Sequence, residues 1–476
     1  MTAAAKTGRA LAEVRPSERQ LDWQEMEFYG FLHFGMNTMT DREWGEGHDD
    51  PALFDPAGLD ADQWITALQS AGMTGVILTC KHHDGFCLWP SDATAYSVAS
   101  SPWRGGAGDV VAEVAAAARR HGLRFGIYLS PWDRTEASYG SGTAYDDFYV
   151  AQLTELLTRY GPVFSVWLDG ANGEGPDGRR QFYDWERYYA VVRELQPDAV
   201  ISVCGPDVRW CGNEAGDTRP DEWSVVPRAL QDAERTADRS QQADDGHFAR
   251  LVRSDDRDLG SRAALAGHED DLVWYPAEVN TSIRPGWFHH PAEDAEVRTV
   301  DELFTVHQRA VGGNSCFLLN VPPAADGRLR GADVAVLEQL GRRIEDFRAR
   351  RIEAATVTVS SGTAGDAATA WPGRGGAPWR PNAPDPLPSV TLEFAGPRTV
   401  EAVVVGEDIA QGQRIEHVVI RGRRWDGRWT TLAEANAVGH QRFLTFRPAE
   451  VDAVRVEVPQ ARDTPVVARV AAIGAA

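Results

Sequence analysis

Between residues 28 and 350 the chain alternates between two patterns of hydrophobic and polar positions. Short, mostly apolar runs such as TGVILTC (74–80) predict buried strands. Longer segments whose apolar positions recur every three or four residues, such as DADQWITALQSAG (60–72), predict helices, and Asp60 can cap this one. The other predicted strands cover 28–35, 124–130, 163–169, 198–205, 221–227, 271–280 and 315–322, and the other predicted helices cover 109–122, 145–161, 184–196, 300–313 and 331–351.

This alternation of strands and helices predicts a parallel sheet whose strands are joined by helical crossovers. The strands lack a regular polar face, as expected when both sides of the sheet are covered. Eight candidate strands in one stretch therefore predict a (β/α)₈-like barrel with long loops. A doubly wound open sheet is the alternative, but no GxGxxG motif follows the first strand.

The composition changes after residue 355. A segment rich in Gly, Pro and Ala is followed by closely spaced β-type runs, which include SVTLEF, TVEAVVVGE, IEHVVIRG, RWTTLAE, RFLTF and AVRVEV. Short strands separated by turns are typical of an antiparallel sandwich. The sequence therefore predicts an α/β architecture in two domains, a (β/α)₈-like barrel at 1–352 followed by an antiparallel β-sandwich domain at 353–476.

The overall composition is that of a folded globular protein, with 43% hydrophobic and 25% charged residues. A net charge of −22 repels phosphate groups, so nucleic acids and anionic membranes are not expected as partners. The five cysteines lack CxxC spacing, which argues against a disulfide framework or a zinc knuckle. The N-terminus has no apolar signal core and no apolar run approaches the roughly 20 residues that span a bilayer, so we expect a cytoplasmic protein.

Polar and aromatic side chains recur where the predicted strands end. The carboxyl ends of the strands in a parallel barrel meet at one face, where barrel enzymes carry their chemistry. A single residue of this kind is more often part of the scaffold, but six strands with the same feature indicate a shared pocket. The candidates are His33, His82, His83, Asp84, Tyr128, Trp167, Asp169, Arg209, Glu214 and Glu278.

Asp169 is the strongest of these candidates. It ends the apolar run FSVWLD and is followed by GANGEG, which has almost no side-chain bulk. A carboxylate that attacks a carbon atom must be fixed, ionised and unobstructed, and a strand end followed by small residues predicts this arrangement. The alternative is a structural role, because Asp-Gly is a common turn pair.

Several segments together resemble the α-L-fucosidases of glycoside hydrolase family 29, in particular the branch that acts on α-1,3- and α-1,4-linked fucose. They are FLHFGMNTM, EWGEG, KHHDGFCLW, GIYLSPWD, VWLDGANGEG, DVRWCGNEAG and YPAEVNTSIRPGWF, in this order along the predicted barrel. The tail VGEDIAQGQRIEHVVIRG is similar to the sandwich, of carbohydrate-binding-module type, that follows the barrel in this family. We expect this domain to brace the barrel rather than to bind glycan.

The resemblance implies a retaining exo-α-L-fucosidase that needs no cofactor or metal and whose partner is a fucosylated, Lewis-type oligosaccharide or glycoconjugate. Asp169 matches the family nucleophile, which forms a covalent fucosyl-enzyme, and Glu214 matches the acid/base of this branch. Glu222 and Glu278 are the reserve candidates for the acid/base. Retention of configuration in two displacements requires the two carboxyl groups to lie roughly 5–5.5 Å apart.

Further residues match family positions around the sugar. Those expected to bind substrate are His33, Glu43, Trp44, His82, His83, Tyr128, Trp167, Arg209, Glu278 and Trp287. Imidazole nitrogens can donate to or accept from sugar hydroxyls, and Trp287 is the expected wall for the apolar methyl group of fucose. A structural role for Glu278, holding the loop of Arg284, is an equal alternative.

Two other functions fit parts of the pattern. The residues His33, His82, His83, Asp84 and Asp169 could form the metal centre of an amidohydrolase-like barrel enzyme, although HxH spacing on the first strand is absent. A non-catalytic carbohydrate-binding protein on the same fold is the second alternative, and it predicts that one carboxyl group of the pair is missing or misplaced. Activity that is insensitive to chelators would exclude the first, and turnover of an aryl fucoside would exclude the second.

Overall fold

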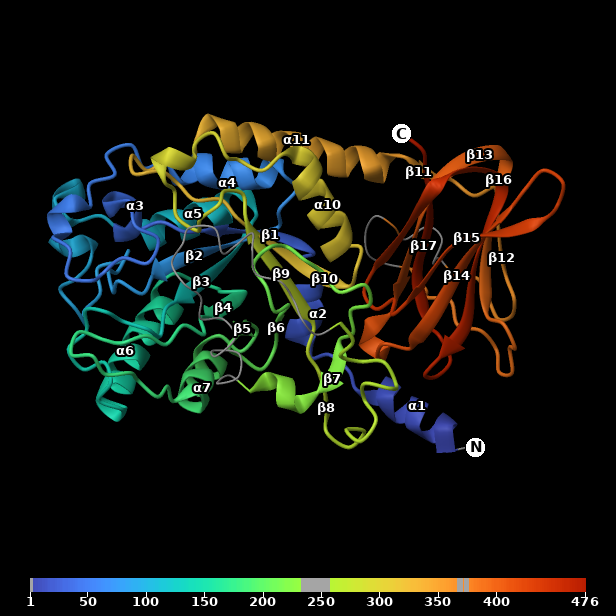
Figure 1. The fold of residues 1–476 in the computed structure, drawn as a ribbon, viewed down its shortest axis with the longest axis horizontal. Helices are drawn as coiled ribbons and strands as arrows, with labels where there is room; N and C mark the ends of the chain where they lie inside the picture. Colours follow the sequence, from blue (N-terminus) through green and yellow to red (C-terminus); the bar gives the residue numbers. More distant parts are fainter. Residues whose placement is uncertain (1–2, 233–256, 366–370, 372–375) are drawn as a thin grey trace.

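The computed structural model describes residues 3–232, 257–365, 371 and 376–476. Figure 1 shows two parts side by side, a parallel barrel surrounded by helices and, coloured orange to red, an antiparallel β-domain formed by the C-terminal part of the chain. The fold is therefore the predicted α/β barrel followed by an antiparallel domain.

The barrel is one eight-stranded sheet in the order β5-β4-β3-β2-β1-β10-β9-β6. Every pair of neighbours along this order is parallel. A single bridge between Ser202 and Val208 joins the two edges, so the barrel is nearly closed. The strands are β1 (Phe28–Leu32), β2 (Gly75–Lys81), β3 (Arg124–Leu129), β4 (Ser165–Leu168), β5 (Val200–Val203), β6 (Arg209–Trp210), β9 (Ala277–Ser282) and β10 (Ser315–Asn320).

The predicted strand at 221–227 is not part of the barrel, and this assignment was wrong. Its described core, β7 (Val225–Pro227), pairs instead with β8 (Leu272–Trp274) in a separate antiparallel ribbon. The predicted strand at 271–280 is divided at Pro276, which has no N–H for a ladder, into β8 and the barrel strand β9. The place in the barrel is taken by the two-residue β6, which sequence patterning left in a loop.

Helices surround the barrel, as Figure 1 shows. Several begin at an aspartate that caps the helix. Asp60, Asp109 and Asp184 each accept a hydrogen bond from a backbone N–H of the first turn. No helix of the described residues is long and apolar enough to cross a membrane. The helices are α1 (Ala3–Glu13), α2 (Glu18–Gln24), α3 (Met36–Thr40), α4 (Ala61–Ser70), α5 (Val110–His121), α6 (Thr143–Arg159), α7 (Trp185–Leu195), α10 (Val300–Ala310) and α11 (Gly331–Ala349).

The C-terminal part is a seven-stranded antiparallel sheet in which two very long strands form the centre. The runs SVTLEF and TVEAVVVGE, predicted as separate strands, are both in β13, and RFLTF and AVRVEV are both in β16. Register shifts interrupt the pairing of these two strands, for example between Glu393 and Arg398, without ending either strand. The strands are β11 (Arg351–Ile352), β12 (Thr356–Val359), β13 (Ser389–Glu407), β14 (Ile415–Arg423), β15 (Trp429–Asn436), β16 (Arg442–Ala461) and β17 (Val467–Gly474).

The C-terminal sheet contacts the barrel at the amino-terminal ends of β1 and β10. His440 Nε2 lies 3.2 Å from an oxygen of Glu27, just before β1, and the Asn314 N–H donates to the Gln441 carbonyl just before β10. A buried apolar cluster that includes Phe347 of α11 and Val404 of β13 joins the two parts. Since barrel chemistry lies at the opposite, carboxyl-terminal ends, these contacts favour a bracing role for the sheet.

Candidate active site

The carboxyl-terminal ends of the first barrel strands bring the predicted aromatic and histidine residues together. The ring centre of His82 lies 4.0 Å from that of His83, 5.7 Å from that of His33 and 5.7 Å from that of Tyr128. Tyr128 in turn stacks on Trp167 at 5.4 Å. Side chains from four consecutive strands therefore form one contiguous cluster.

Asp169, directly after β4, is held by two hydrogen bonds. The Tyr128 hydroxyl donates to its Oδ2 at 2.7 Å, and the Ala171 N–H donates to its Oδ1 at 2.8 Å. The Nε2 atom of His83 lies 3.9 Å from Oδ2. The side chain keeps 19% of its surface exposed. Asp169 therefore caps the following turn with one oxygen, as the structural alternative predicts, and presents the other oxygen to the cluster.

The glycines after Asp169 serve a different purpose from the one that the sequence suggested. A Cβ atom on Gly173 would overlap the Trp132 ring, and one on Gly175 would overlap the Tyr139 ring. Trp132 also donates its indole N–H to the Glu174 carbonyl at 3.0 Å. These two glycines allow close packing of rings against the loop rather than leaving room for a ligand.

Glu214 lies in the loop after β6 and is half-buried. Burial raises the pKa of its carboxyl well above the usual value, and the charges of Asp169 and Glu43 raise it further. The Trp287 indole N–H donates to its Oε2 at 3.4 Å. The surroundings of Glu214, which include the Asp169 carboxyl group, therefore favour its protonated form.

The reserve candidate Glu222 has a different environment. Burial favours its neutral form, but the charges of Arg209 and Arg219 outweigh this effect and lower its pKa. Arg209 pairs with one oxygen of Glu222, and Arg219 lies 3.2 Å from the other. Arg209 is thus buried and paired with Glu222, and among the described residues it has no hydrogen bond to Glu214. Glu222 is held between two arginines, which favour its ionised form.

Glu278 lies inside the barrel, behind Trp167. The Trp167 indole N–H donates to its Oε1 at 2.9 Å, and the Tyr29 hydroxyl donates to Oε2. Its side chain is fully buried, and burial raises its pKa to about 7. It does not hold the loop of Arg284, which pairs with Asp333 at 3.0 Å. Glu278 therefore orients Trp167 and does not itself face the cluster.

Glu43 holds the loop that carries Trp287. Its carboxylate accepts hydrogen bonds from the backbone N–H groups of Trp287 and Phe288, the second at 3.2 Å. The Trp287 ring lies 5.0 Å from the His33 ring, and so it stands between His33 and Glu214. Trp44 meets the His83 ring edge-on at 6.2 Å. Both members of the predicted Glu-Trp pair therefore lie at the cluster, with Glu43 in a supporting position.

The hydrogen bonds of His83 fix its tautomer. Its Nδ1 lies 2.7 Å from the Ser130 hydroxyl, which uses its only hydrogen to donate to the Trp132 carbonyl at 2.7 Å. Ser130 must therefore accept from His83, so Nδ1 carries the proton and Nε2 is an acceptor facing the site. Burial lowers the pKa of His83 to about 4, which keeps the ring neutral near pH 7.

His33 is fixed in the same way by Asn320, at the end of β10. The Asn320 amide nitrogen donates to the Trp287 carbonyl at 2.7 Å, so its Oδ1 accepts from His33 Nδ1 at 2.8 Å. Burial lowers the pKa of His33 to about 3. Two neutral imidazoles thus offer acceptors to the site. Sequence reasoning missed Ser130, Trp132 and Asn320, although all three lie at or just after strand ends.

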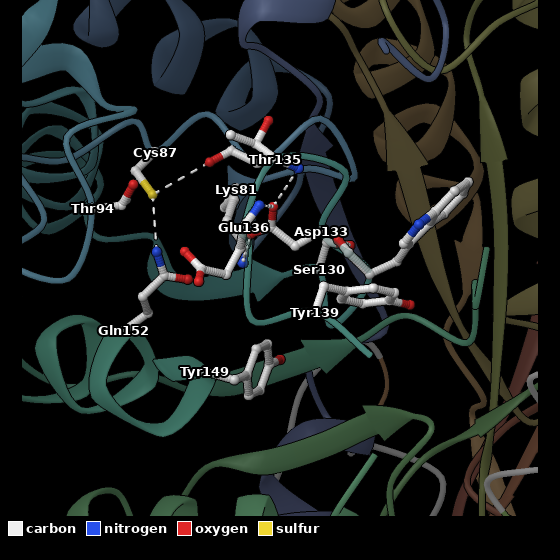
Figure 2. A network of polar contacts seen from close by, with 12 residues as sticks. Lys81, Cys87, Thr94, Ser130, Asp133, Thr135, Glu136, Tyr139, Tyr149 and Gln152 are labelled. Carbon is white, nitrogen blue, oxygen red and sulfur yellow. Dashed lines mark hydrogen bonds and ion pairs between the residues drawn. The ribbon is translucent and has the colours of Figure 1, made fainter. Parts of the chain in front are cut away.

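A buried ion pair between Lys81 and Asp133, drawn in Figure 2, lies next to the histidine segment in the chain. Lys81 Nζ lies 2.8 Å from Asp133 Oδ2, and both side chains are almost fully buried. The other Asp133 oxygen accepts from the N–H groups of Thr135 and Glu136, each at 2.9 Å. Because Lys81 ends β2 immediately before His82, the pair ties the histidine segment to the loop after β3.

The metal hypothesis requires ligands that converge. Within residues 3–232, 257–365, 371 and 376–476, no group of three or more His, Cys, Asp or Glu side chains is placed to hold a metal ion. Asp84 is occupied by the Phe86 N–H at 3.2 Å. The described residues instead place two carboxyl groups with different surroundings beside hydrogen-bond acceptors and indole rings. This arrangement suits acid/base and nucleophilic chemistry on a polar ring.

Known proteins resemble this chain over nearly its whole length. Residues 15–347 match the family model for alpha-L-fucosidase. Alpha-L-fucosidase 1 of Arabidopsis thaliana is 38% identical over 461 residues, which cover 95% of this chain and 86% of that protein. The crystal structure of a Bacteroides ovatus protein matches this chain with a TM-score of 0.85 and 39% identity. The match covers 100% of this chain and 76% of that protein chain. A Ruminococcus gnavus GH29 fucosidase in complex with fucose has a TM-score of 0.80 and 27% identity, with 98% and 95% covered.

Proposed function

This chain belongs to the α-L-fucosidase family, glycoside hydrolase family 29, and on that basis we propose that it releases fucose from α-1,3- and α-1,4-fucosylated, Lewis-type glycans, with Asp169 and Glu214 as its catalytic carboxyl groups. The family is one of retaining glycoside hydrolases. Retention in two displacements needs one ionised carboxylate that attacks and one protonated carboxyl group that donates.

The observation that carries the assignment is the difference between the two carboxyl groups. Asp169 accepts from a tyrosine hydroxyl and a backbone N–H, which are donors that suit a carboxylate. No cation of the described residues pairs with Glu214, and the charge of Asp169 helps to raise its pKa. The reserve candidates lack this combination, because Glu222 is locked between arginines and Glu278 is enclosed behind Trp167.

In the proposed first step, the free Oδ2 lone pair of Asp169 attacks the anomeric carbon of fucose. The glycosidic C–O bond breaks, and the leaving oxygen takes the proton of Glu214. In the second step the Glu214 carboxylate removes a proton from water, whose oxygen attacks the same carbon and releases Asp169. Each step inverts the anomeric carbon, so the product keeps the configuration of the substrate.

The remaining residues of the cluster would bind the sugar. His33 and His83 present neutral acceptors, which suit sugar hydroxyls that donate. The Trp287 ring offers an apolar face for the methyl group of fucose. The fucose complex of the Ruminococcus gnavus enzyme supports the choice of sugar. The proposed linkage preference rests on the joint resemblance of the seven segments to the α-1,3/1,4 branch, in which the segment DVRWCGNEAG carries the acid/base position.

One experiment tests substrate, linkage and stereochemistry together. The purified protein is incubated with a branched α-1,3/1,4-fucosylated trisaccharide and, separately, with a linear α-1,2-fucosylated one, and the products are followed by NMR. We expect fucose to appear first as the α-anomer, from the branched substrate. Release of the β-anomer would contradict the two-step mechanism, and preference for the linear substrate would contradict the linkage assignment.

Glu214→Gln tests the acid/base role. Only a poor leaving group needs protonation, so the variant should lose far more activity on the trisaccharide than on an aryl fucoside with an acidic phenol. Equal losses on both substrates would assign the proton donor to another residue. Glu222→Gln is the matched control, and its losses on the two substrates should be equal.

A further inference from the structure

A histidine outside the cluster, His290, bridges two carboxylates. Its Nε2 lies 2.9 Å from Oε2 of Glu43, and its Nδ1 lies 2.7 Å from Oδ1 of Asp41. With a carboxylate at each ring nitrogen, both nitrogens donate and the ring is an imidazolium. We call Asp41, Glu43 and His290 the Glu43 clamp. Two of its members lie after β1 and the third lies in the loop after β9, so the clamp joins two distant segments.

The clamp is attached to Glu214 through Trp287. Glu43 accepts the backbone N–H of Trp287, and the Trp287 indole N–H donates to Glu214. The packing is close, because a Cβ atom on Gly286 would lie 2.8 Å from Glu43 Oε2 and 3.3 Å from His290 Cδ2. A change in the clamp therefore moves the ring that orients Glu214.

The clamp also connects to Glu214 through charge. The groups that act on the Glu214 carboxyl are Asp169, Glu43 and the Trp287 indole, and the negative charge of Glu43 disfavours ionisation of Glu214. The positive ring of His290 lies next to the Glu43 carboxylate and compensates its negative charge. The hydrogen bond to Glu43 is the largest cause that raises the pKa of His290 to about 9, with burial opposing it and Asp41 and Glu293 adding to it.

We propose that His290 is a positioning residue for the acid/base of this enzyme: as an imidazolium between Asp41 and Glu43 it fixes the Trp287 ring against Glu214 and offsets the charge that Glu43 exerts on it. This inference rests on the proposed role of Glu214. It adds that His290, which contacts Asp41 and Glu43, adjusts the pKa and the position of Glu214. In this proposal Glu43 affects proton transfer by Glu214 indirectly, through its charge and through its hydrogen bond to the Trp287 N–H.

His290→Gln separates charge from geometry, because glutamine keeps an N–H donor for Glu43 but carries no charge. The uncompensated charge of Glu43 then disfavours the Glu214 anion, so the alkaline limb of kcat/KM should move to higher pH by roughly half a unit. Glu43→Gln removes the negative charge itself and should move the same limb to lower pH. Loss of the Trp287 anchor should also reduce kcat/KM several-fold more for the trisaccharide than for the aryl fucoside.

His289→Gln is the matched control. His289 is the neighbour of His290 on the same loop, but its ring pairs with Asp294, at 3.0 Å, rather than with Glu43. This variant should leave both the alkaline limb and the ratio between the two substrates unchanged. Circular dichroism and thermal unfolding of all variants show whether each one is folded.

Two results would overturn the proposal. One is an unshifted alkaline limb in folded His290→Gln, with equal losses on both substrates, which would assign His290 a merely structural role. The other is a shift of the limb in the same direction for His290→Gln and Glu43→Gln. Failure of the proposed function is distinguishable, because in that case Glu214→Gln would itself retain the alkaline limb of the parent enzyme.

Discussion

Replacing Tyr128 by Phe tests how Asp169 works in the two steps. The hydroxyl of this buried tyrosine donates to Asp169 Oδ2 at 2.7 Å, whereas the ring packs on Trp167 and His82. Phenylalanine keeps the ring contacts and removes only the donor. Asp169 retains the Ala171 N–H on its other oxygen, so its orientation is preserved and the change acts mainly on charge.

The effect should differ between the steps because the charge on Asp169 changes in opposite directions. Asp169 loses its negative charge as it attacks the sugar, and it regains the charge when water displaces it. A hydrogen bond to a charged group contributes about 1.5–3 kcal/mol. If half of the charge has returned in the second transition state, the lost stabilisation is about 0.8–1.5 kcal/mol, which is roughly a 4- to 13-fold loss in kcat.

The assay is stopped-flow release of the phenol from an aryl fucoside. We expect Tyr128→Phe to show a burst of one equivalent followed by a steady rate about 4- to 13-fold below that of the parent enzyme, because the fucosyl-enzyme accumulates. Mass spectrometry should detect the fucosyl adduct on Asp169. A variant with unchanged kcat and no burst would refute this account of the hydrogen bond.

Three further predictions concern single carboxyl groups. Asp169→Asn should reduce turnover of an aryl fucoside by roughly three orders of magnitude or more, and azide should restore product formation in Asp169→Gly; undiminished turnover would remove Asp169 as the nucleophile. Glu278→Gln should lower the free energy of unfolding in urea by about 1–3 kcal/mol, because one of two buried donors loses its acceptor, while kcat/KM stays within about tenfold of the parent value. The pKa of Glu27 is lowered from 4.5 to about 2, since its bond to His440 and nearby arginines outweigh burial. It therefore contributes about 3 kcal/mol of stability that is present above pH 4.5 and is lost as the pH falls towards 2, so the stability difference between Glu27→Gln and the parent should shrink over that window.

The sequence predicted the barrel because its signals are local. Each long strand and helix carries its own hydrophobic period, and caps such as Asp60 and Asp109 mark helix starts within three residues. The barrel strand β6 could not be predicted, because it carries no local signal of this kind. With only Arg209 and Trp210, β6 has no period to detect, and its place is set by hydrogen bonds to the neighbouring strand, where the Arg209 N–H donates to the Pro276 carbonyl at 2.8 Å.

The site was predictable as a set of residues but not as a set of roles. Glu43, Glu214, Glu222 and Glu278 all belong to motifs or strand ends, and a carboxyl group looks the same in each sequence context. What separates them is the partner that reaches them across the fold: backbone N–H groups for Glu43, arginines for Glu222, and an indole and a phenol for Glu278. Apart from Arg219, which is three positions from Glu222, those partners lie 13 to 249 positions away in the chain, so hydrophobic periodicity cannot report them. Glu214 differs because it is only half-buried and lies near Asp169 and Glu43, whose charges together with burial raise its pKa. The proposed proton donor is thus the one glutamate of the four that combines partial exposure with the neighbouring charge of Asp169, and this combination is a property of the fold rather than of the motif.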